Sequence, residues 1–109
     1  MARLIQIPKE EHLEYLRMLM VNKYGKPIVN RLDCGNLESQ ILKFQNKRLS
    51  IDTLLRLFNI KKGKNLPSIY TLDTCSLFVG YKNWNDLIIN YQKQSLLYQK
   101  NIIFKLINQ

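Results

Sequence analysis

The sequence predicts an all-α protein of about five helices in one domain, with a long C-terminal helix. Three observations lead to this prediction. Apolar residues recur at steps of three and four, capping residues precede the apolar stretches, and the one strand-like alternation is in residues 4–7. The 109 residues are 46% hydrophobic and 23% charged, which suits a single core. We expect a flexible arm over residues 1–8 and a helical domain over residues 9–89.

The first two helices are predicted from their ends and their apolar spacing. Pro8 and the two acids that follow Lys9 mark the start of a helix over about residues 9–24, which a Gly-Lys-Pro sequence ends. Asp33 is the expected cap of a second helix that fades near Asn46. The expected buried positions are Leu13, Leu16, Met20, Tyr24, Leu37, Ile41, Leu42 and Phe44.

A third and a fourth helix follow, separated by a basic loop. Ser50 is expected to cap a short helix that ends at Phe58, because its hydroxyl can accept a free backbone N–H of the first turn. Residues 61–68 combine Gly, Pro, Asn and Ser and are predicted to form a loop. The fourth helix is expected over about residues 71–79 and ends at Gly80.

The fifth helix is predicted to begin at Trp84, where Asn83 and Asp86 resemble a capping box, and nothing interrupts it up to the C-terminus. It carries two apolar stripes, whereas a core of this size has room for one. We therefore expect residues 90–109 to extend the helix and to form a homodimer. The predicted dimer contacts are Leu96, Ile103 and Ile107.

The charge is strongly positive and is concentrated in one part of the chain. Seventeen Lys and Arg against eight Asp and Glu give a formal net charge of +9, which attracts polyanions. Residues 43–64 hold seven of these cations and one acid, a net charge of +6. The alternative is a basic surface that serves solubility. The predicted phosphate contacts are Lys43, Lys47, Arg48, Lys61, Lys62 and Lys64.

The residue types that enzymes and metal sites need are scarce. Cys34 and Cys75 have only His12 as a further zinc-type ligand, and His12 is expected on the surface of the first helix. We therefore expect no metal, no cofactor and no enzymatic activity, since paired carboxylates and a glycine-rich phosphate loop are also missing. The sequence has no secretory signal and no apolar run long enough to cross a bilayer, which suggests a cytoplasmic protein.

Residues 37–59 have the pattern of a helix, a turn and a second helix. A helix that reads the major groove needs short polar residues near its start, an apolar face toward its domain, and cations around it. Here Leu54, Leu57 and Phe58 are expected to face inward. The alternative is that the hydroxyl residues only cap the helix and that the arginine pairs with the aspartate. The predicted base contacts are Ser50, Asp52, Thr53 and Arg56.

Two segments resemble known DNA-binding families. One likeness, over about residues 37–89, is to the phage-repressor or Cro-like helix-turn-helix family, in the pattern Ser50-x-x-Thr53-Leu54-x-Arg56-Leu57-Phe58, a basic loop and Pro67-Ser68-x-x-Thr71-Leu72. It implies that the serine-led helix enters the major groove and that the Pro-Ser segment opens the next helix. Residues 75–87, with their Gly-Tyr pair, are similar to the second helix-turn-helix of AraC-type regulators. That likeness implies a turn at the pair and a DNA-reading helix after it.

The sequence as a whole favours a helix-turn-helix DNA-binding protein, with duplex DNA as its partner and transcription regulation as its role. Two alternatives stay open. One is an RNA-binding or ribosome-associated protein, which shares the charge but needs no helix that fits a groove. The other is an interaction adaptor, whose terminal helix docks on a partner and whose basic surface is incidental.

Overall fold

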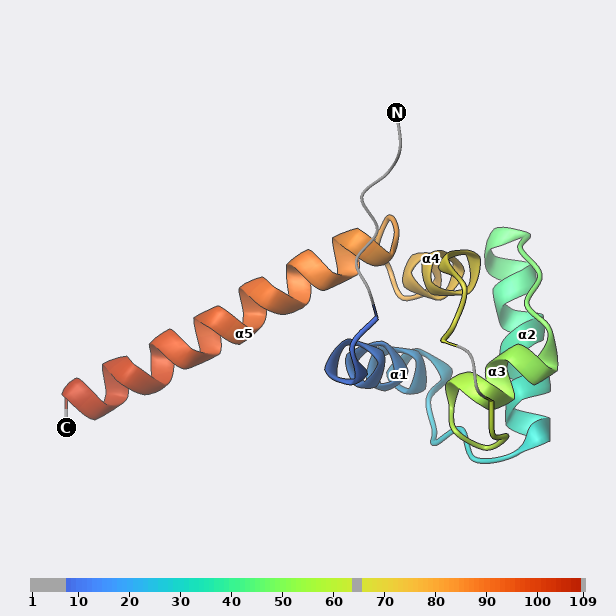
Figure 1. Ribbon diagram of the computed structural model, residues 1–109, viewed down its shortest axis with the longest axis horizontal. Helices are drawn as coiled ribbons and strands as arrows, with labels where there is room; N and C mark the ends of the chain where they lie inside the picture. The colour runs from blue at the N-terminus through green and yellow to red at the C-terminus, as the bar shows by residue number, and fades with distance from the viewer. Residues whose placement is uncertain (1–7, 64–65, 109) are drawn as a thin grey trace.

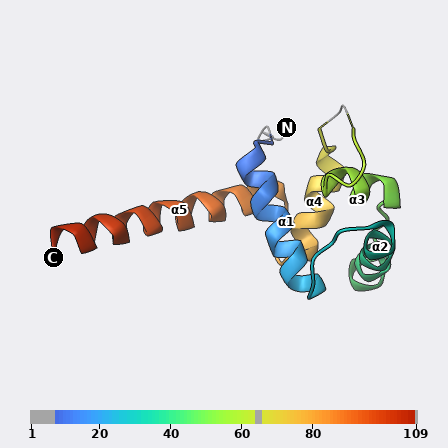
Figure 2. The same cartoon turned by 90° about the horizontal axis from the view of Figure 1, so that it is seen from below.

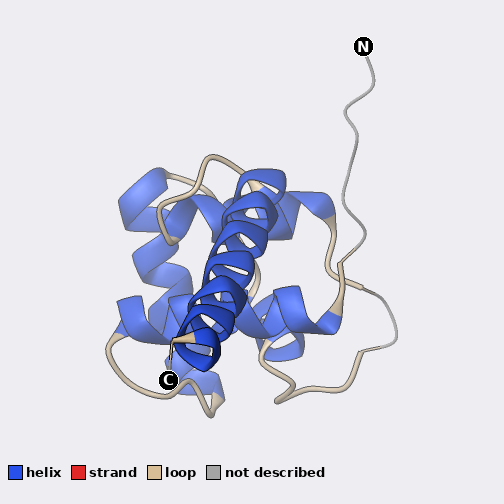
Figure 3. Cartoon of the chain, turned by 90° about the vertical axis from the view of Figure 1, so that its left-hand side faces the viewer, coloured by secondary structure: helices blue, strands red, loops and turns tan. Residues whose placement is uncertain are grey.

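The computed structural model describes residues 8–63 and 66–108, and in these ranges the chain is all-helical, as the sequence predicts (Figure 1). No strand occurs in the described part of the chain (Figure 3). None of the described helices has the length and apolar character that crossing a bilayer requires. The expected arm lies, apart from Pro8, outside the described residues. The helices are α1 (Glu10–Tyr24), α2 (Arg31–Gln45), α3 (Ile51–Leu57), α4 (Ile69–Phe78) and α5 (Trp84–Ile107).

Side-chain caps fix where three of the helices begin. Ser50, Ser68 and Asn83 each accept a backbone N–H three residues further on, and so cap α3, α4 and α5. Because of its serine, α4 begins two residues earlier than predicted. Gly25 and Gly80 follow α1 and α4 with φ of 97° and 103°, a region that residues with a Cβ rarely adopt.

The cap of α2 is Asn30 and not the predicted Asp33. Asn30 Oδ1 accepts the backbone N–H of Asp33 at 2.9 Å. Asp33 is itself buried, and its carboxylate accepts from the backbone of Val29 and from the hydroxyl of Tyr24, each at 3.0 Å. The hydrogen bond from Val29 lowers the pKa of Asp33, as does that from Tyr24. This acid therefore joins the start of α2 to the end of α1.

The core forms where α5 packs on α1 and α4, and where α2 packs on α3 and α4. Trp84, the first residue of α5, is its largest fully buried side chain. Phe44 was predicted to be buried but is 62% exposed, with its ring edge-on to Phe78. The other core residues are Leu13, Leu16, Met20, Ile28, Cys34, Leu37, Ile41, Leu49, Leu54, Leu55, Leu57, Leu72, Cys75, Leu87 and Ile88.

The helices are arranged so that the molecule has two unlike ends (Figures 1 and 2). α1 and α4 lie in the middle, and α2 and α3 lie at one end. At the other end α5 continues beyond the core, as predicted. Every residue in the second half of α5, residues 96–107, which we call the free half, is exposed.

His12 is buried, which corrects the surface position predicted for it. Its ring lies edge-on to Trp84 and Tyr91, with centroid separations of 6.4 and 5.2 Å, where α1 meets α5. His12 stands four residues before the buried Leu16, on a side of α1 that α5 covers, and the sequence did not indicate which side that is. Burial lowers the pKa of His12, and Glu11, whose carboxylate lies 3.9 Å from Nε2, opposes this shift.

We expect the stability to fall as the pH is lowered through the histidine range. The unfolded chain protonates His12 near pH 6.5, whereas the folded chain does so only at lower pH. The free energy of unfolding therefore decreases between pH 6.5 and the folded pKa, and this group does not affect it well above pH 6.5. Urea unfolding between about pH 5.5 and 7.5 should show this slope, and His12→Gln, which removes the chain's only histidine, should abolish it. Equal slopes in both proteins would contradict the shift.

Candidate nucleic-acid interface around α3

α3 is a seven-residue helix that two hydroxyl groups hold at its start. Ser50 Oγ accepts the backbone N–H of Thr53 at 3.0 Å and lies 2.8 Å from the Thr53 hydroxyl. Two of the four residues predicted as base contacts, Ser50 and Thr53, thus form the cap. A hydroxyl has one donor and two acceptor positions, so each can cap the helix and still offer a further hydrogen bond.

The inward face of α3 is wider than predicted. Leu54 and Leu57 are buried, as expected, and Phe58 is half-buried. Leu55 is buried as well, which the sequence pattern did not indicate. The helix therefore has a narrow outward face with three side chains. Arg56 is exposed, and Asp52 and Thr53 are half-buried.

α3 lies across the N-terminal half of α2. Ile51 Cδ1 would lie 3.8 Å from a Cβ added at Gly35, and Arg31 lies 3.8 Å from the carboxylate of Asp52. Both contacts on α2 are close to its start, although α3 follows the end of α2 in sequence. The connecting residues 46–50 therefore run back along α2 (Figure 1). This connection takes the place of a compact turn at the end of α2.

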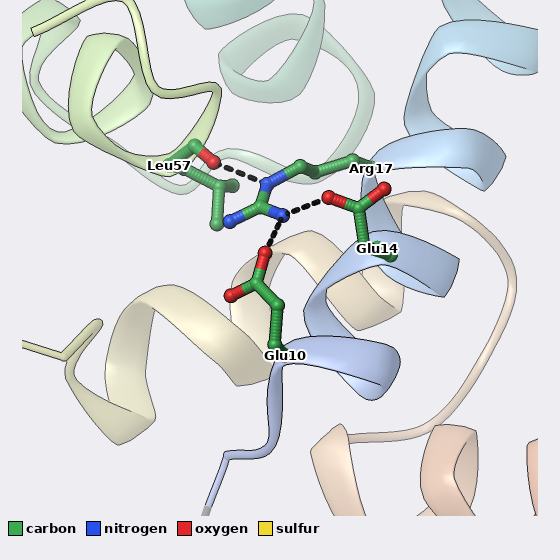
Figure 4. A network of polar contacts seen from close by, with 4 residues as sticks. All are labelled: Glu10, Glu14, Arg17 and Leu57. Atoms are coloured by element: carbon green, nitrogen blue, oxygen red, sulfur yellow. Dashed lines mark hydrogen bonds and ion pairs between the residues drawn. The ribbon is translucent and has the colours of Figure 1, made fainter.

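Arg17 of α1 holds the other end of α3 (Figure 4). Its Nε donates to the carbonyl of Leu57 at 2.5 Å, and its Nη1 donates to Glu10 and Glu14, each at 2.7 Å. Leu57 ends α3, so its carbonyl has no partner within the helix. The hydrogen bond from Arg17 also lowers the pKa of Glu10. Arg17 therefore fixes α3 on α1 and pairs with two acids beside it.

The loop after α3 folds back onto the helix. Lys61 donates its backbone N–H to the carbonyl of Leu55 at 3.1 Å, and its Nζ lies 3.4 Å from Asp52. Gly63 approaches Arg56 so closely that an added Cβ would lie 2.8 Å from Arg56 Cδ. Asp52 is thus held between cations of α2 and of the loop, and the stem of Arg56 is packed beneath the loop.

A hollow of about 1170 Å³ opens between α1, α3, this loop and the start of α4. Its cations come from α3, from the loop and, as Arg17, from α1, and its hydroxyl groups come from the starts of α3 and α4. Glu10 is the acid on the α1 side, where it is paired with Arg17. Cations and hydroxyl donors are the groups that bind phosphate oxygens. Besides Arg17, the cations and hydroxyl residues that line the hollow are Thr53, Arg56, Lys61, Lys62, Ser68 and Thr71.

The other predicted phosphate contacts lie at different distances from α3. Lys47 and Arg48 are exposed on the connection that leads into the helix. Lys43 is exposed on the last turn of α2, at the end of that helix farther from its contacts with α3. Lys64 lies outside the described residues.

Arg31 belongs to the same surface, although the sequence patterns did not include it. With Asp33 as the predicted cap, Arg31 lay outside the second helix, whereas the cap at Asn30 puts it in the first turn of α2, where the macrodipole disfavours a cation. We call this set of residues the α3 surface: Arg31, Lys47, Arg48, Asp52, Thr53, Arg56, Lys61 and Lys62.

Comparison with known proteins assigns the chain to no family. No family model matches it, and neither a curated protein nor a solved structure matches it. Among the described residues, no three His, Cys, Asp or Glu side chains are grouped so that they could hold a metal ion. A function for the chain must therefore be inferred from the chemistry of its surfaces.

We expect Arg17→Met to destabilise the protein by about 1.5–3 kcal/mol, because the variant cannot form the hydrogen bond from a charged group to the last carbonyl of α3. Urea unfolding at neutral pH measures the change. Glu14→Gln is the matched control, since this carboxylate is 65% exposed and surface pairs contribute at most about 1 kcal/mol. If Arg17→Met unfolds at the same urea concentration as the parent, α3 does not depend on this contact.

Proposed function

We propose that the chain binds duplex DNA through the α3 surface and acts as a transcriptional regulator of a modified helix-turn-helix type, in which a connection along α2 replaces the compact turn. In this proposal α3 enters the major groove, and the cations before and after it contact phosphates on either side. α3 is about 10 Å long and the groove is about 12 Å wide, so a helix of this size can enter it.

The observation that carries the proposal is the surplus of positive charge around α3. The α3 surface holds six cations and one acid, and that acid is already placed between Arg31 and Lys61. The neighbouring carboxylates of Glu10 and Glu14 are paired with Arg17. The field that a polyanion meets at this surface is therefore positive, because its six cations exceed its one acid, and Arg17 offsets one of the two negative charges of Glu10 and Glu14.

Three outward side chains of α3 are proposed to contact base edges. Arg56 is proposed to make the bidentate contact that guanidinium groups make with guanine, which its exposed position on α3 and the packing of Gly63 against its stem support. Asp52 and Thr53 lie in the first turn, and Ser50 is the cap before them. Carboxylates and hydroxyls at such positions accept from cytosine and adenine amino groups.

We expect affinity for a duplex to fall steeply between about 50 and 200 mM salt, because binding to phosphates releases counterions. Replacing Lys61, Lys62 and Lys64 with Ala should weaken binding to all sequences alike and reduce the slope by about 0.9 for every phosphate that is no longer neutralised. The control is Lys105→Ala on the free half of α5, which removes charge at the other end of the molecule.

Fluorescence anisotropy with a labelled duplex measures both slopes. A parent affinity that does not change with salt would contradict the proposal, as would equal losses of affinity in the loop variant and the α5 control. Tighter binding to structured RNA than to duplex DNA at equal salt would favour an RNA-binding protein instead.

We expect Arg56→Lys to keep the salt dependence of binding but to relax the preference for one base pair. Lysine retains the charge and lacks the fork of donors, and a bidentate contact contributes about 1–3 kcal/mol of discrimination. Asp52→Ala with Thr53→Ala should change the preference at neighbouring positions, and Ser50 would still cap the backbone. Selection from a randomised duplex pool measures these preferences. An unchanged consensus in all variants would exclude α3 as the reading helix.

A further inference from the structure

The free half of α5 is largely apolar, and none of the residues that the structure describes covers it. Residues 96–107 project from the domain (Figures 1 and 2), and all of them are exposed. An isolated helix of about 12 residues is marginal in water, so such a segment depends on packing of an apolar face. Its large apolar side chains, which are 40–75% exposed, are Leu96, Leu97, Tyr98, Ile102, Ile103, Phe104, Leu106 and Ile107.

The exposed area on one side of α5 is within the range that one partner of a dimer contributes. A half-exposed side chain of this size leaves on the order of 100 Å² of apolar surface open. Six such side chains share that side and together leave roughly 600 Å² open: Ile89, Leu96, Ile102, Ile103, Leu106 and Ile107. A stable interface of standard size buries about 600–1000 Å² on each partner. This side of α5 therefore offers enough apolar surface for a small interface with one further helix of the same kind.

The spacing of the exposed residues fits pairing of two identical helices. The apolar residues Ile89, Leu96 and Ile103 are seven residues apart. Three residues after each of them come Gln92, Gln99 and Leu106, in that order. Ile89 is 45% exposed, because it lies on the side of α5 away from Trp84 and Ile88. This seam therefore starts beside the domain and continues through the free half.

The lysines beside the seam select the parallel arrangement. Lys93 and Lys100 flank it on one side, and Ser95 and Ile102 flank it on the other. In a parallel pair each lysine side faces the neutral side of the partner helix, whereas an antiparallel pair brings the two lysine sides together. Parallel pairing also places Gln99 opposite the same residue of the second copy, where two amides can hydrogen-bond to each other.

We propose that α5 pairs in parallel with α5 of a second copy along the seam of Ile89, Leu96, Gln99, Ile103 and Leu106. Ile107 lies beside this seam at its end. The pairing does not depend on DNA. It places the two α3 surfaces at the same end of the dimer, because α2 and α3 lie at the far end of each domain from the free half (Figures 1 and 2). Two copies can then engage two half-sites on one duplex.

Light scattering of the full chain without DNA tests the pairing. We expect a dimer at about 50 µM and a monomer for Leu96→Asp with Ile103→Asp. Leu97→Asp with Phe104→Asp is the matched control, since these side chains are 60% and 68% exposed but lie on the side of α5 away from the seam. The control should stay dimeric. A monomeric parent, or a dimer that only the control variant dissociates, would overturn the proposal.

Disulfide trapping tests the orientation. Gln99→Cys should form an interchain disulfide under mild oxidation, because the two sulfurs meet across a parallel seam, and Asn101→Cys, on the opposite side, should not. The native Cys34 and Cys75 do not compete, because both are buried and burial raises the pKa of Cys75 to about 12. Equal cross-linking at both positions, or none at Gln99, would overturn the parallel seam. A monomeric variant that still binds duplex DNA in a salt-dependent way would leave the proposed function intact.

Discussion

The α3 surface depends on how a two-turn helix is held at both of its ends. Seven residues do not form a stable helix alone, so the position of α3 comes from its surroundings. Ser50 caps its start, Arg17 binds the carbonyl at its end, and the leucines between them lie in the core. Ile51 of the helix lies against Gly35 of α2, and the loop after the helix returns onto it at Arg56. The side chains proposed to meet DNA are therefore carried on a backbone that is fixed before any ligand binds, which reduces the ordering cost of binding.

The same contacts that build the fold also separate the charges. Arg17 forms ion pairs with Glu10 and Glu14, and Asp33 is buried at the junction of α1 and α2. Several of the chain's few acids are therefore bound to other groups of the fold. The cations of the loop and of the connection stay exposed at one end. The other end is an apolar helix with few charges. The two surfaces are thus distinct in chemistry and in place, and each suggests its own kind of partner.

Local signals in the sequence predicted most of the fold. The features that they did not predict depend on contacts between residues far apart in the chain. Caps at Ser50 and Asn83 and the apolar stripes are local features, and they placed the helices to within a few residues. Asn30 caps α2 in place of the predicted Asp33, because Asp33 is buried where it accepts from the hydroxyl of Tyr24 and the backbone of Val29. The burial of His12 depends on where α5 packs. In the candidate site, the residue types were predictable, but the return of the connection along α2 is a long-range feature that no local pattern records.

The proposed contact of DNA with the α3 surface can be observed by titrating the ¹⁵N-labelled chain with a duplex and following its backbone amide resonances. We expect the amides of residues 50–53 and 60–63 to shift together in proportion to bound DNA, while those of residues 96–107 do not shift. Shifts centred on the start of α5 at residues 83–90, or no shifts at a salt concentration where binding is detected by other means, would contradict it.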